Sequence, residues 1–252
     1  MNRADRVTTQ VLNAHIDVIG WDETLIRIRN WAAQRESRYV CICNVHSVVV
    51  VSQDADFKQA VNEADMATPD GAPVAWMLRR SGFYGQERIN GPDLMWKYLE
   101  ATTHAEPIFF YGSTEATLDT LRDRLSIAFP YLKIAGMISP PFRQLSTVED
   151  AAMVARINES GAGIVFVGLG CPKQEKWMAS NRGRINAVMV GVGAAFDYHA
   201  GTIRRAPRWM QRIGLEWLHR LCSEPRRLWK RYLVTNTVFI VHAAHQLLFG
   251  RR

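Results

Sequence analysis

Short apolar runs alternate with amphipathic helical patterns along most of this chain, and this alternation constrains the fold more than any single motif does. Each run is rich in β-branched or aromatic residues and stops at glycine, proline or a polar residue. The predicted strands are 11–18, 39–43, 65–68, 107–111, 133–138, 163–167 and 187–192. Strands separated by helices form a largely parallel sheet that helices cover on both faces. The sequence therefore predicts an α/β fold with two Rossmann-like halves, roughly 1–105 and 106–200.

The last part of the chain, 201–252, differs from this α/β body in its charge. It holds eleven Lys or Arg against two acids, whereas residues 1–200 hold twenty basic and twenty-two acidic residues. Met210, Ile213, Trp217 and Leu221 recur at helical spacing among these arginines. The pattern predicts a basic, tryptophan-rich helical appendage that associates with an anionic membrane surface. The alternative is a helix that packs on the body and exposes a solvated basic face.

Three further features bear on where the chain works. The first ten residues, MNRADRVTTQ, lack the apolar segment of a signal peptide. The four cysteines follow no disulfide or zinc spacing, which is typical of a reduced cytoplasmic setting. The apolar segment 233–249 is interrupted by histidines and amides, whereas a spanning helix needs about 20 mostly apolar residues. We expect this segment to pack or to lie on a surface rather than to span a bilayer.

Polar and glycine-rich residues follow the predicted strands at the points where the strands end. In open parallel sheets, ligands bind at these carboxyl ends. The residues there are Asn44, Asp70, Gly112-Ser113, Ser139-Pro140-Pro141, Gly168-Leu169-Gly170 and Asp197. We expect them to surround one crevice, which makes them the first candidates for a functional site.

The segment Gly168-Leu169-Gly170 follows a predicted strand and precedes a helix that Pro172 opens. Glycines in this position let backbone N–H groups approach a phosphate at a helix N-terminus. The dinucleotide fingerprint has a third glycine where this chain has Lys173, so a nicotinamide fingerprint is incomplete. A tight strand-to-helix turn without a ligand is the other interpretation.

Charged residues in the first half have candidate chemical roles. Asp70 lies in a Pro-Asp-Gly turn, where it either serves only as a turn former or accepts a proton from an attacking hydroxyl. Arg88 either binds a diphosphate or forms an ion pair with a nearby acid. Asp54 and Asp56 match the Asp-x-Asp metal motif of many sugar-nucleotide transferases, but residues two apart on a helix point in different directions. We therefore interpret this pair as solvated and predict no metal site.

Together, several blocks of the chain resemble the WecG/TagA/CpsF family of bacterial glycosyltransferases, glycosyltransferase family 26. The blocks run in family order from about residue 10 to residue 235, and their joint order and spacing make the resemblance specific. The matching blocks are ATPDG and PV (67–74), ERI and GPDL (87–94), FYG (110–112), SPPF (139–142), VGLG and PKQE (167–175), GVGA and FD (191–197), RAP (205–207), GLEWL (214–218) and EP (224–225).

The resemblance implies an inverting, metal-independent transfer of a sugar from a UDP donor to a polyprenyl-diphosphate-linked glycan. Members add N-acetylmannosamine, N-acetylmannosaminuronic acid or glucose during the biosynthesis of cell-surface polysaccharides. The resemblance implies that Asp70 is the base and that Asn44 is a second catalytic residue. It implies substrate-binding roles for Thr68, Arg88, Asp93, Gly112, Gly168, Gln174, Asp197, Arg220, Arg227 and Arg231. The threonine that some members carry two residues before the asparagine is Ile42 here.

An enzyme of this kind uses no cofactor. Its expected partners are the UDP-sugar, a lipid-diphosphate-linked acceptor and the membrane surface. These partners imply a peripheral location on the cytoplasmic face of the bacterial inner membrane. The sequence leaves open whether the protein forms a homo-oligomer. Two rival classes follow from the residues alone: a nicotinamide-binding oxidoreductase, and a nucleic-acid-binding protein suggested by the pI near 9.5. In a nucleic-acid-binding protein the basic residues would form a groove on the body rather than a tail interleaved with tryptophans.

Overall fold

The computed structural model describes residues 6–102 and 106–249. These residues form two compact units, each made of segments that are separate in sequence. Unit 1 contains 6–20, 42–90 and 204–249, and unit 2 contains 21–41, 91–102 and 106–203. The contiguous halves 1–105 and 106–200 and the appendage 201–252 stay a prediction about domains. In the structure, the described tail residues 204–249 group with the other segments of unit 1.

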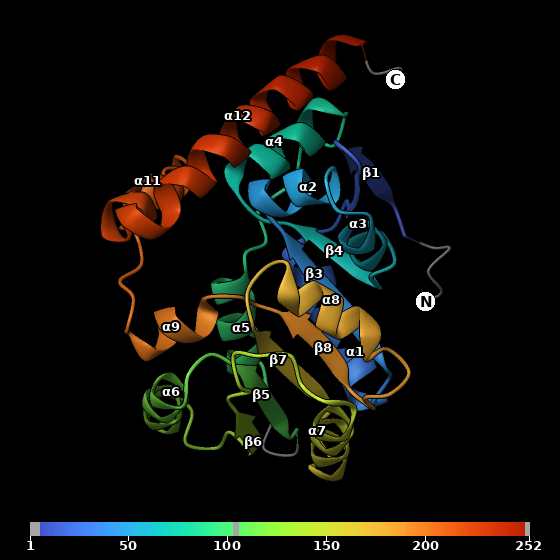
Figure 1. The fold of residues 1–252 in the computed structure, drawn as a ribbon, viewed down its shortest axis with the longest axis vertical. Helices are drawn as coiled ribbons and strands as arrows, with labels where there is room; N and C mark the ends of the chain where they lie inside the picture. Colours follow the sequence, from blue (N-terminus) through green and yellow to red (C-terminus); the bar gives the residue numbers. More distant parts are fainter. Residues whose placement is uncertain (1–5, 103–105, 250–252) are drawn as a thin grey trace. The chain divides into compact units, whose positions relative to one another are not determined.

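Unit 2 is built on parallel strands (Figure 1). Its strands are β3 (Arg38–Cys43), β5 (Ile108–Gly112), β6 (Ile134–Ile138), β7 (Ile164–Gly168) and β8 (Val188–Gly191). Their order is β3-β8-β7-β5-β6, and each pair is parallel. All five residues of β5 are buried, as expected for a strand that is covered on both faces. The predicted parallel sheet is confirmed.

The helices of unit 2 separate these strands along the sequence. They are α1 (Trp21–Ala33), α5 (Gly91–Glu100), α6 (Glu115–Ala128), α7 (Thr147–Glu159), α8 (Lys173–Ser180) and α9 (Ala195–Ala200). Residues at their N-termini explain where two of them begin. Ser146 and Glu149 form a complete capping box at α7, and α8 begins directly after Pro172, where the sequence predicts a helix start.

Unit 1 combines a hairpin, one strand of the larger sheet and most of the C-terminal helices. Its elements are β1 (Thr8–Val11), β2 (Ala14–Asp17), α2 (Val45–Val51), α3 (Ala55–Asn62), β4 (Met66–Pro69), α4 (Ala72–Arg80), α10 (Arg208–Arg212), α11 (Glu216–Ser223) and α12 (Pro225–Phe249). The last two residues of β3 belong to this unit, and β4 is the strand next to β3 in the sheet order. The carboxyl end of β4 therefore leads into the residues that the sequence singles out around Asp70.

Two sequence expectations in unit 1 are corrected by the structure. The predicted single strand 11–18 is the second part of an antiparallel hairpin, because the chain turns at Leu12, whose backbone adopts a left-handed conformation (φ 53°). The apolar spacing through Val48 and Phe57 predicts one helix from the sequence, whereas the structure has two, α2 and α3. Asp54 starts the second, and its carboxylate accepts a hydrogen bond from the N–H of Phe57 at 2.9 Å.

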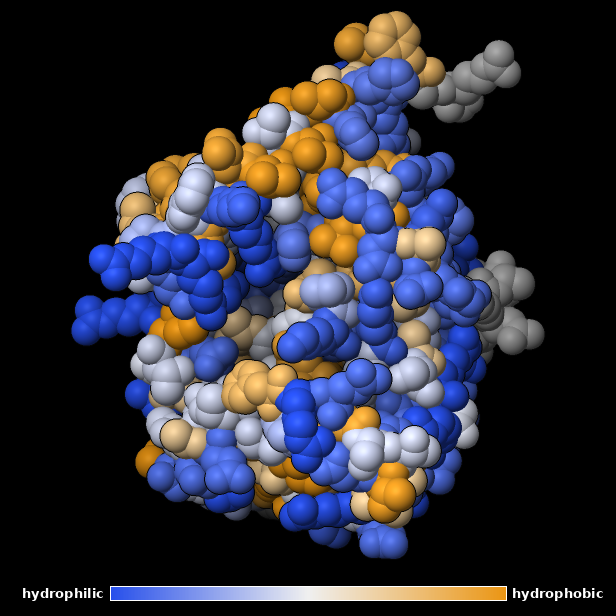
Figure 2. Space-filling model, viewed as in Figure 1, coloured by the Kyte–Doolittle hydropathy of each residue, from blue (hydrophilic) through white to orange (hydrophobic). Residues whose placement is uncertain are grey.

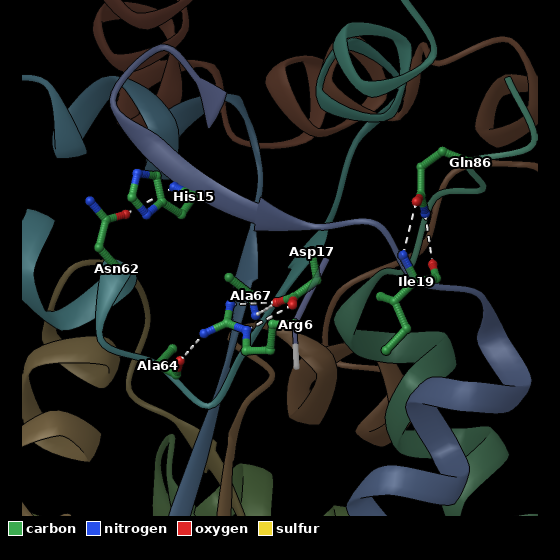
Figure 3. A network of polar contacts seen from close by, with 8 residues as sticks. All are labelled: Arg6, His15, Asp17, Ile19, Asn62, Ala64, Ala67 and Gln86. Carbon is green, nitrogen blue, oxygen red and sulfur yellow. Dashed lines mark hydrogen bonds and ion pairs between the residues drawn. The ribbon is translucent and has the colours of Figure 1, made fainter. Parts of the chain in front are cut away.

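A buried ion pair fixes the hairpin of unit 1 to β4 (Figure 3). The guanidinium of Arg6 donates to both carboxylate oxygens of Asp17, and also to the carbonyl of Ala64. Asp17 in turn accepts a hydrogen bond from the backbone N–H of Ala67. The side chains of Arg6 and Asp17 are 7% and 2% exposed, so both charges are satisfied inside the unit rather than by water. β4 is thereby held in a defined register beside the hairpin.

The C-terminal helix α12 packs on unit 1 by one face and exposes the other. Leu228, Thr235, Phe239 and Ala243 are buried on the inner face, and α12 runs along α2 (Figure 1). The exposed apolar residues are Trp229, Leu233, Val234, Ile240, Val241, Leu247, Leu248 and Phe249. These residues form the apolar ridge of α12, and Figure 2 shows apolar surface along much of this helix. Among the described residues α12 is the one helix long and apolar enough to cross a membrane by length and composition.

Candidate active site

The predicted site residues fall into two groups, one in each unit. Unit 1 holds Asn44, Thr68, Asp70, Arg88, Arg220, Arg227 and Arg231. Unit 2 holds Asp93, Gly112, Gly168, Gln174 and Asp197.

Asp70 stands directly after β4, at the point where the chain turns into α4. Its backbone N–H donates to the carbonyl of Cys43 at 2.9 Å, so the turn is tied to the end of β3. Gly71 follows with a left-handed backbone (φ 82°) that favours glycine, and α4 begins one residue later. This geometry fixes the carboxylate of Asp70 at a strand end, which is where the sequence predicts a ligand site.

The surroundings of Asp70 shift its acidity. Burial raises the pKa of its carboxyl from 3.8 to about 6. The positive charge of Arg88 opposes this rise, and the negative charge of Glu216 adds to it; a hydrogen bond from the N–H of Gly71 and the charge of Arg205 lower the pKa further. A carboxylate with a pKa near 6 is ionised at neutral pH and accepts a proton more readily than an ordinary aspartate does. These properties suit the role of general base that the sequence predicts for Asp70.

Arg88 forms an ion pair with an acid from the C-terminal helices. Its Nη2 lies 3.0 Å from Oε2 of Glu216, the first residue of α11. Arg205 approaches the other oxygen of Glu216 at 3.5 Å and also donates to Oδ1 of Asn90 at 3.2 Å. Of the two sequence interpretations of Arg88, the ion pair is the one seen in this structure. Arg205 and Glu216 lie within the RAP and GLEWL blocks, but their local sequence pattern does not assign them to the site.

Asn44 lies beside Asp70's turn and caps α2. A Cβ atom built on Gly71 would lie 4.0 Å from Cβ of Asn44, so the two loops are in contact. The side-chain oxygen of Asn44 accepts a hydrogen bond from the N–H of Ser47 at 3.2 Å. Because this oxygen is committed to the cap, a substrate contact by Asn44 has to use its amide nitrogen.

Thr68 is buried within β4 and faces the protein rather than solvent. Its side chain is fully buried, and its hydroxyl lies 3.5 Å from the carbonyl of Ile89. Ile89 also donates its N–H to the carbonyl of Pro69 at 2.9 Å. In this structure Thr68 therefore supports the segment that carries Arg88.

The three appendage arginines occupy different environments. Arg231 on α12 lies near His46, because its charge, together with burial as the larger cause, lowers the pKa of His46 to about 4. Arg220 on α11 lies 3.8 Å from Glu224. Its charge also opposes the rise that burial causes in the pKa of Tyr232. Arg227 is exposed and pairs with Glu224 at 2.6 Å. His46 is two residues from Asn44, so Arg231 lies near the segment that carries this predicted catalytic residue.

In unit 2, the ends of β5 and β7 touch through two glycines. A Cβ atom on Gly112 would lie 2.5 Å from the backbone of Gly168, so no side chain fits there. The N–H of Ser113, which is left-handed (φ 60°), donates to the carbonyl of Gly168 at 3.1 Å. The hydroxyl of Ser113 lies 3.5 Å from Oδ1 of Asp197 on α9. Gly112, Gly168 and Asp197 are thus brought together, as expected from the strand-end argument.

Gln174 joins two glycine-containing loops of unit 2. Its side-chain oxygen accepts hydrogen bonds from the N–H groups of Gly170 and Gly193, at 3.2 and 3.1 Å. Its nitrogen donates to Glu175 at 2.9 Å, and the residue is buried. Asp93, the remaining predicted residue of this unit, lies in the first turn of α5.

Asp54 and Asp56 lie in different environments at the start of α3. Asp54 caps α3 and Asp56 is exposed in its first turn. Within residues 6–102 and 106–249, no group of three or more His, Cys, Asp or Glu has the arrangement to hold a metal ion. The positive charge near Asp70 comes from arginine side chains instead.

Comparison with known proteins gives a consistent result over nearly the whole chain. A family model described as "Glycosyl transferase WecG/TagA/CpsF family" matches residues 9–252. An N-acetylglucosaminyldiphosphoundecaprenol N-acetyl-beta-D-mannosaminyltransferase of Bacillus subtilis (strain 168) is 32% identical over 208 residues, which are 81% of this chain and 78% of that protein. A protein of the same name from Bacillus spizizenii is 31% identical over 202 residues, 79% of this chain and 76% of that protein.

Proposed function

Because this chain belongs to the WecG/TagA/CpsF family of glycosyl transferases, we propose that it moves a sugar from a UDP-sugar to a polyprenyl-diphosphate-linked glycan. The transferred sugar is a hexose or an N-acetylhexosamine, and N-acetylmannosamine is the first candidate because both relatives are named as N-acetylmannosaminyltransferases. One observation carries the proposal: a carboxylate with a raised pKa stands at a strand end beside two arginines. Glycosyl transfer to a hydroxyl requires a base for the hydroxyl proton and positive charge for the leaving diphosphate.

The proposed reaction is a single displacement with inversion. Asp70 removes the proton from an acceptor hydroxyl as the hydroxyl oxygen attacks the anomeric carbon from the face opposite UDP. The bond between the anomeric carbon and the diphosphate oxygen breaks, and its electron pair leaves with UDP. One base is sufficient for this step, and cationic side chains stabilise the negative charge that develops on the leaving group. In this proposal Asn44, which adjoins the turn of Asp70, orients the acceptor.

We propose that the transfer proceeds without a metal ion. Arg88 and Arg205 already supply positive charge near Asp70, and Asp54 has a structural task as a helix cap. EDTA should leave transfer intact, and an Asp54→Asn, Asp56→Asn variant should stay active because asparagine also caps helices well. A divalent-ion requirement that this variant abolishes would contradict the proposal.

The strand ends of unit 2 are the proposed site of the UDP part of the donor. Gly112 and Gly168 end β5 and β7 without side chains, and the space where a Cβ of Gly170 would stand is open, which suits the close approach of a ligand. Asp197 offers a carboxylate for ribose or uracil groups. Gln174 acts on this site by holding the loops of Gly170 and Gly193 in place, and Asp93 stays a predicted contact.

We propose that the protein is peripheral to the membrane, on its cytoplasmic face. A lipid-linked acceptor requires the enzyme to work at a bilayer surface. The outer face of α12 supports this, because its apolar ridge is preceded by the exposed basic residues Arg226 and Lys230. The inner face of the same helix is buried against unit 1, which suits a helix lying in the interface rather than across the bilayer.

The proposal is tested by measuring UDP release over a panel of UDP-sugars. The acceptor is a short-chain prenyl-diphosphate N-acetylglucosamine, so that the full-length protein needs no vesicles. We expect release with one UDP-hexose or UDP-N-acetylhexosamine, and only when the acceptor is present. Binding of NAD(P) without UDP release would instead favour an oxidoreductase.

A further inference from the structure

A single carboxylate of unit 1 is held between two arginines. Glu216 presents Oε2 to Arg88 at 3.0 Å and Oε1 to Arg205 at 3.5 Å, so each oxygen faces a different guanidinium. The side chains are 17%, 23% and 23% exposed for Arg88, Glu216 and Arg205, which places the group at the edge of solvent rather than in the core. Two guanidinium groups that converge on one anion are a common way for proteins to hold phosphate.

The two arginines reach this point from different parts of the chain. Arg88 lies between α4 and α5, and Arg205 lies between α9 and α10. The side chain of Arg205 is also fixed by its hydrogen bond to Asn90. The charges of Arg88, Glu216 and Arg205 all act on the carboxyl of Asp70, so this group lies next to the proposed base.

We propose that Arg88 and Arg205 form a diphosphate-binding pair beside Asp70, and that Glu216 occupies this pair until the diphosphate of a substrate displaces it. The inference rests on the proposed function and adds to it. It assigns Arg205 as a substrate-binding residue, and it makes Glu216 a built-in competitor of the substrate.

Charge balance explains why Glu216 has to leave. In the structure, Arg88 and Arg205 are matched by Asp70 and Glu216, two cations against two anions. A diphosphate that entered with Glu216 in place would meet two carboxylates and be repelled. Once Glu216 withdraws, the pair faces the diphosphate without the competing carboxylate, and Asp70 stays beside it. The bound diphosphate then raises the basicity of Asp70 as Glu216 did, so the base stays active in the complex.

The position of Glu216 makes its withdrawal a local event. It opens the eight-residue helix α11, and the next two residues, Trp217 and Leu218, are exposed. The withdrawal that we propose is a rotation of the first turn of α11 that carries the carboxylate away from the arginines.

The experiment compares the binding of inorganic pyrophosphate with that of UDP to the full chain by calorimetry. In Glu216→Gln, a neutral amide replaces the competing carboxylate at nearly the same size. We expect pyrophosphate to bind about fivefold more tightly, or better, than to the wild type. Glu87→Gln is the matched control, because Glu87 is an exposed acid next to Arg88 in sequence; its affinity for pyrophosphate should match the wild type.

A second variant keeps the inference testable if Glu216→Gln folds poorly. Arg205→Gln should weaken pyrophosphate binding about fivefold or more, and it should cancel the gain when combined with Glu216→Gln. Unchanged or weaker binding in a folded Glu216→Gln protein overturns the inference, and so does unchanged binding in Arg205→Gln.

The UDP titration separates this inference from the proposed function. Pyrophosphate binding that responds to both variants, without any binding of UDP, would support the anion site and contradict the UDP-sugar donor. A different result would contradict the role of Glu216 and leave the proposed function intact. In that result the wild type binds UDP, but Glu216→Gln binds pyrophosphate no more tightly than the wild type does.

Discussion

The side-chain amide of Gln246, near the end of α12, bonds to the hairpin turn at Leu12. Its oxygen accepts a hydrogen bond from the N–H of Leu12 at 2.8 Å, and its nitrogen donates to the carbonyl of Gln10 at 2.7 Å. The two ends of the chain are therefore joined inside unit 1. The C-terminal helix is part of the structure of this unit as well as a candidate membrane contact.

The first prediction concerns deletion of the C-terminal helices. The alternation of predicted strands and helices ends by Asp197. From the sequence alone, a chain that lacks the residues from Gly201 onward is therefore expected to fold. In the structure such a deletion removes the whole of α12, including the buried residues Leu228, Phe239 and Ala243 that pack on unit 1. We expect unit 1 to lose protection in hydrogen exchange while unit 2 keeps it.

Point variants of α12 provide the control for this deletion. Gln246→Ala should lower the free energy of unfolding by about 1–2 kcal/mol, because two backbone groups of the hairpin lose their partner. His242→Ala, at an exposed position of the same helix, should change it by less than about 0.5 kcal/mol. Equal protection of unit 1 with and without the tail would show that α12 only rests on the surface.

The second prediction concerns the base. Asp70→Asn keeps the shape of the turn and removes the proton acceptor. We expect the rate of sugar transfer to fall about 10²-fold or more, with binding of UDP largely retained. Transfer and UDP binding are measured on the same preparation, and turnover near the wild-type rate would reduce Asp70 to a turn residue.

The third prediction concerns pH. The pKa of Asp70 is about 6, and transfer needs its ionised form, so kcat/KM should rise with pH and level off above about 6. The raised pKa has the opposite effect on stability. The folded protein holds this proton more tightly than the unfolded chain does, so the free energy of unfolding falls as pH rises from about 4 to about 6.

Asp70→Asn removes this titration and should therefore raise the melting temperature at pH 7.5 by about 2–6 °C relative to the wild type. At pH 4.5 the difference should shrink. An acid limb of kcat/KM near pH 4, or a stability gain that does not depend on pH, would mean that Asp70 titrates like an ordinary aspartate.

The fourth prediction concerns the apolar ridge of α12. Leu233 and Ile240 are 62% and 65% exposed, so replacing both with glutamine removes apolar surface without opening a cavity. We expect binding to vesicles of anionic lipid to weaken about tenfold or more, with the melting temperature unchanged. Ile127→Gln, at an isoleucine on α6 that is 80% exposed, is the matched control and should bind vesicles normally.

Salt provides a second readout of the same contact. Because the arginines of the appendage contribute long-range attraction, vesicle binding of the wild type should weaken as ionic strength rises. Vesicle binding that survives the double glutamine variant would place the membrane contact on another surface.

The sequence by itself determined the parallel α/β fold, because strands such as 163–167 and the helix start after Pro172 depend on patterns within a few residues. It also singled out Asp70, since a strand end followed by glycine is a local signal. It predicted one strand at 11–18 and one helix through Val48 and Phe57, because the left-handed Leu12 and the cap at Asp54 carry no strong local mark. Only the tertiary structure decided that the basic tail packs into unit 1 and that Glu216 lies between Arg88 and Arg205. The ion pair of Arg88 with Glu216 joins residues more than a hundred positions apart in the sequence. Such contacts depend on how buried faces and charges meet in three dimensions, which a local sequence pattern does not record.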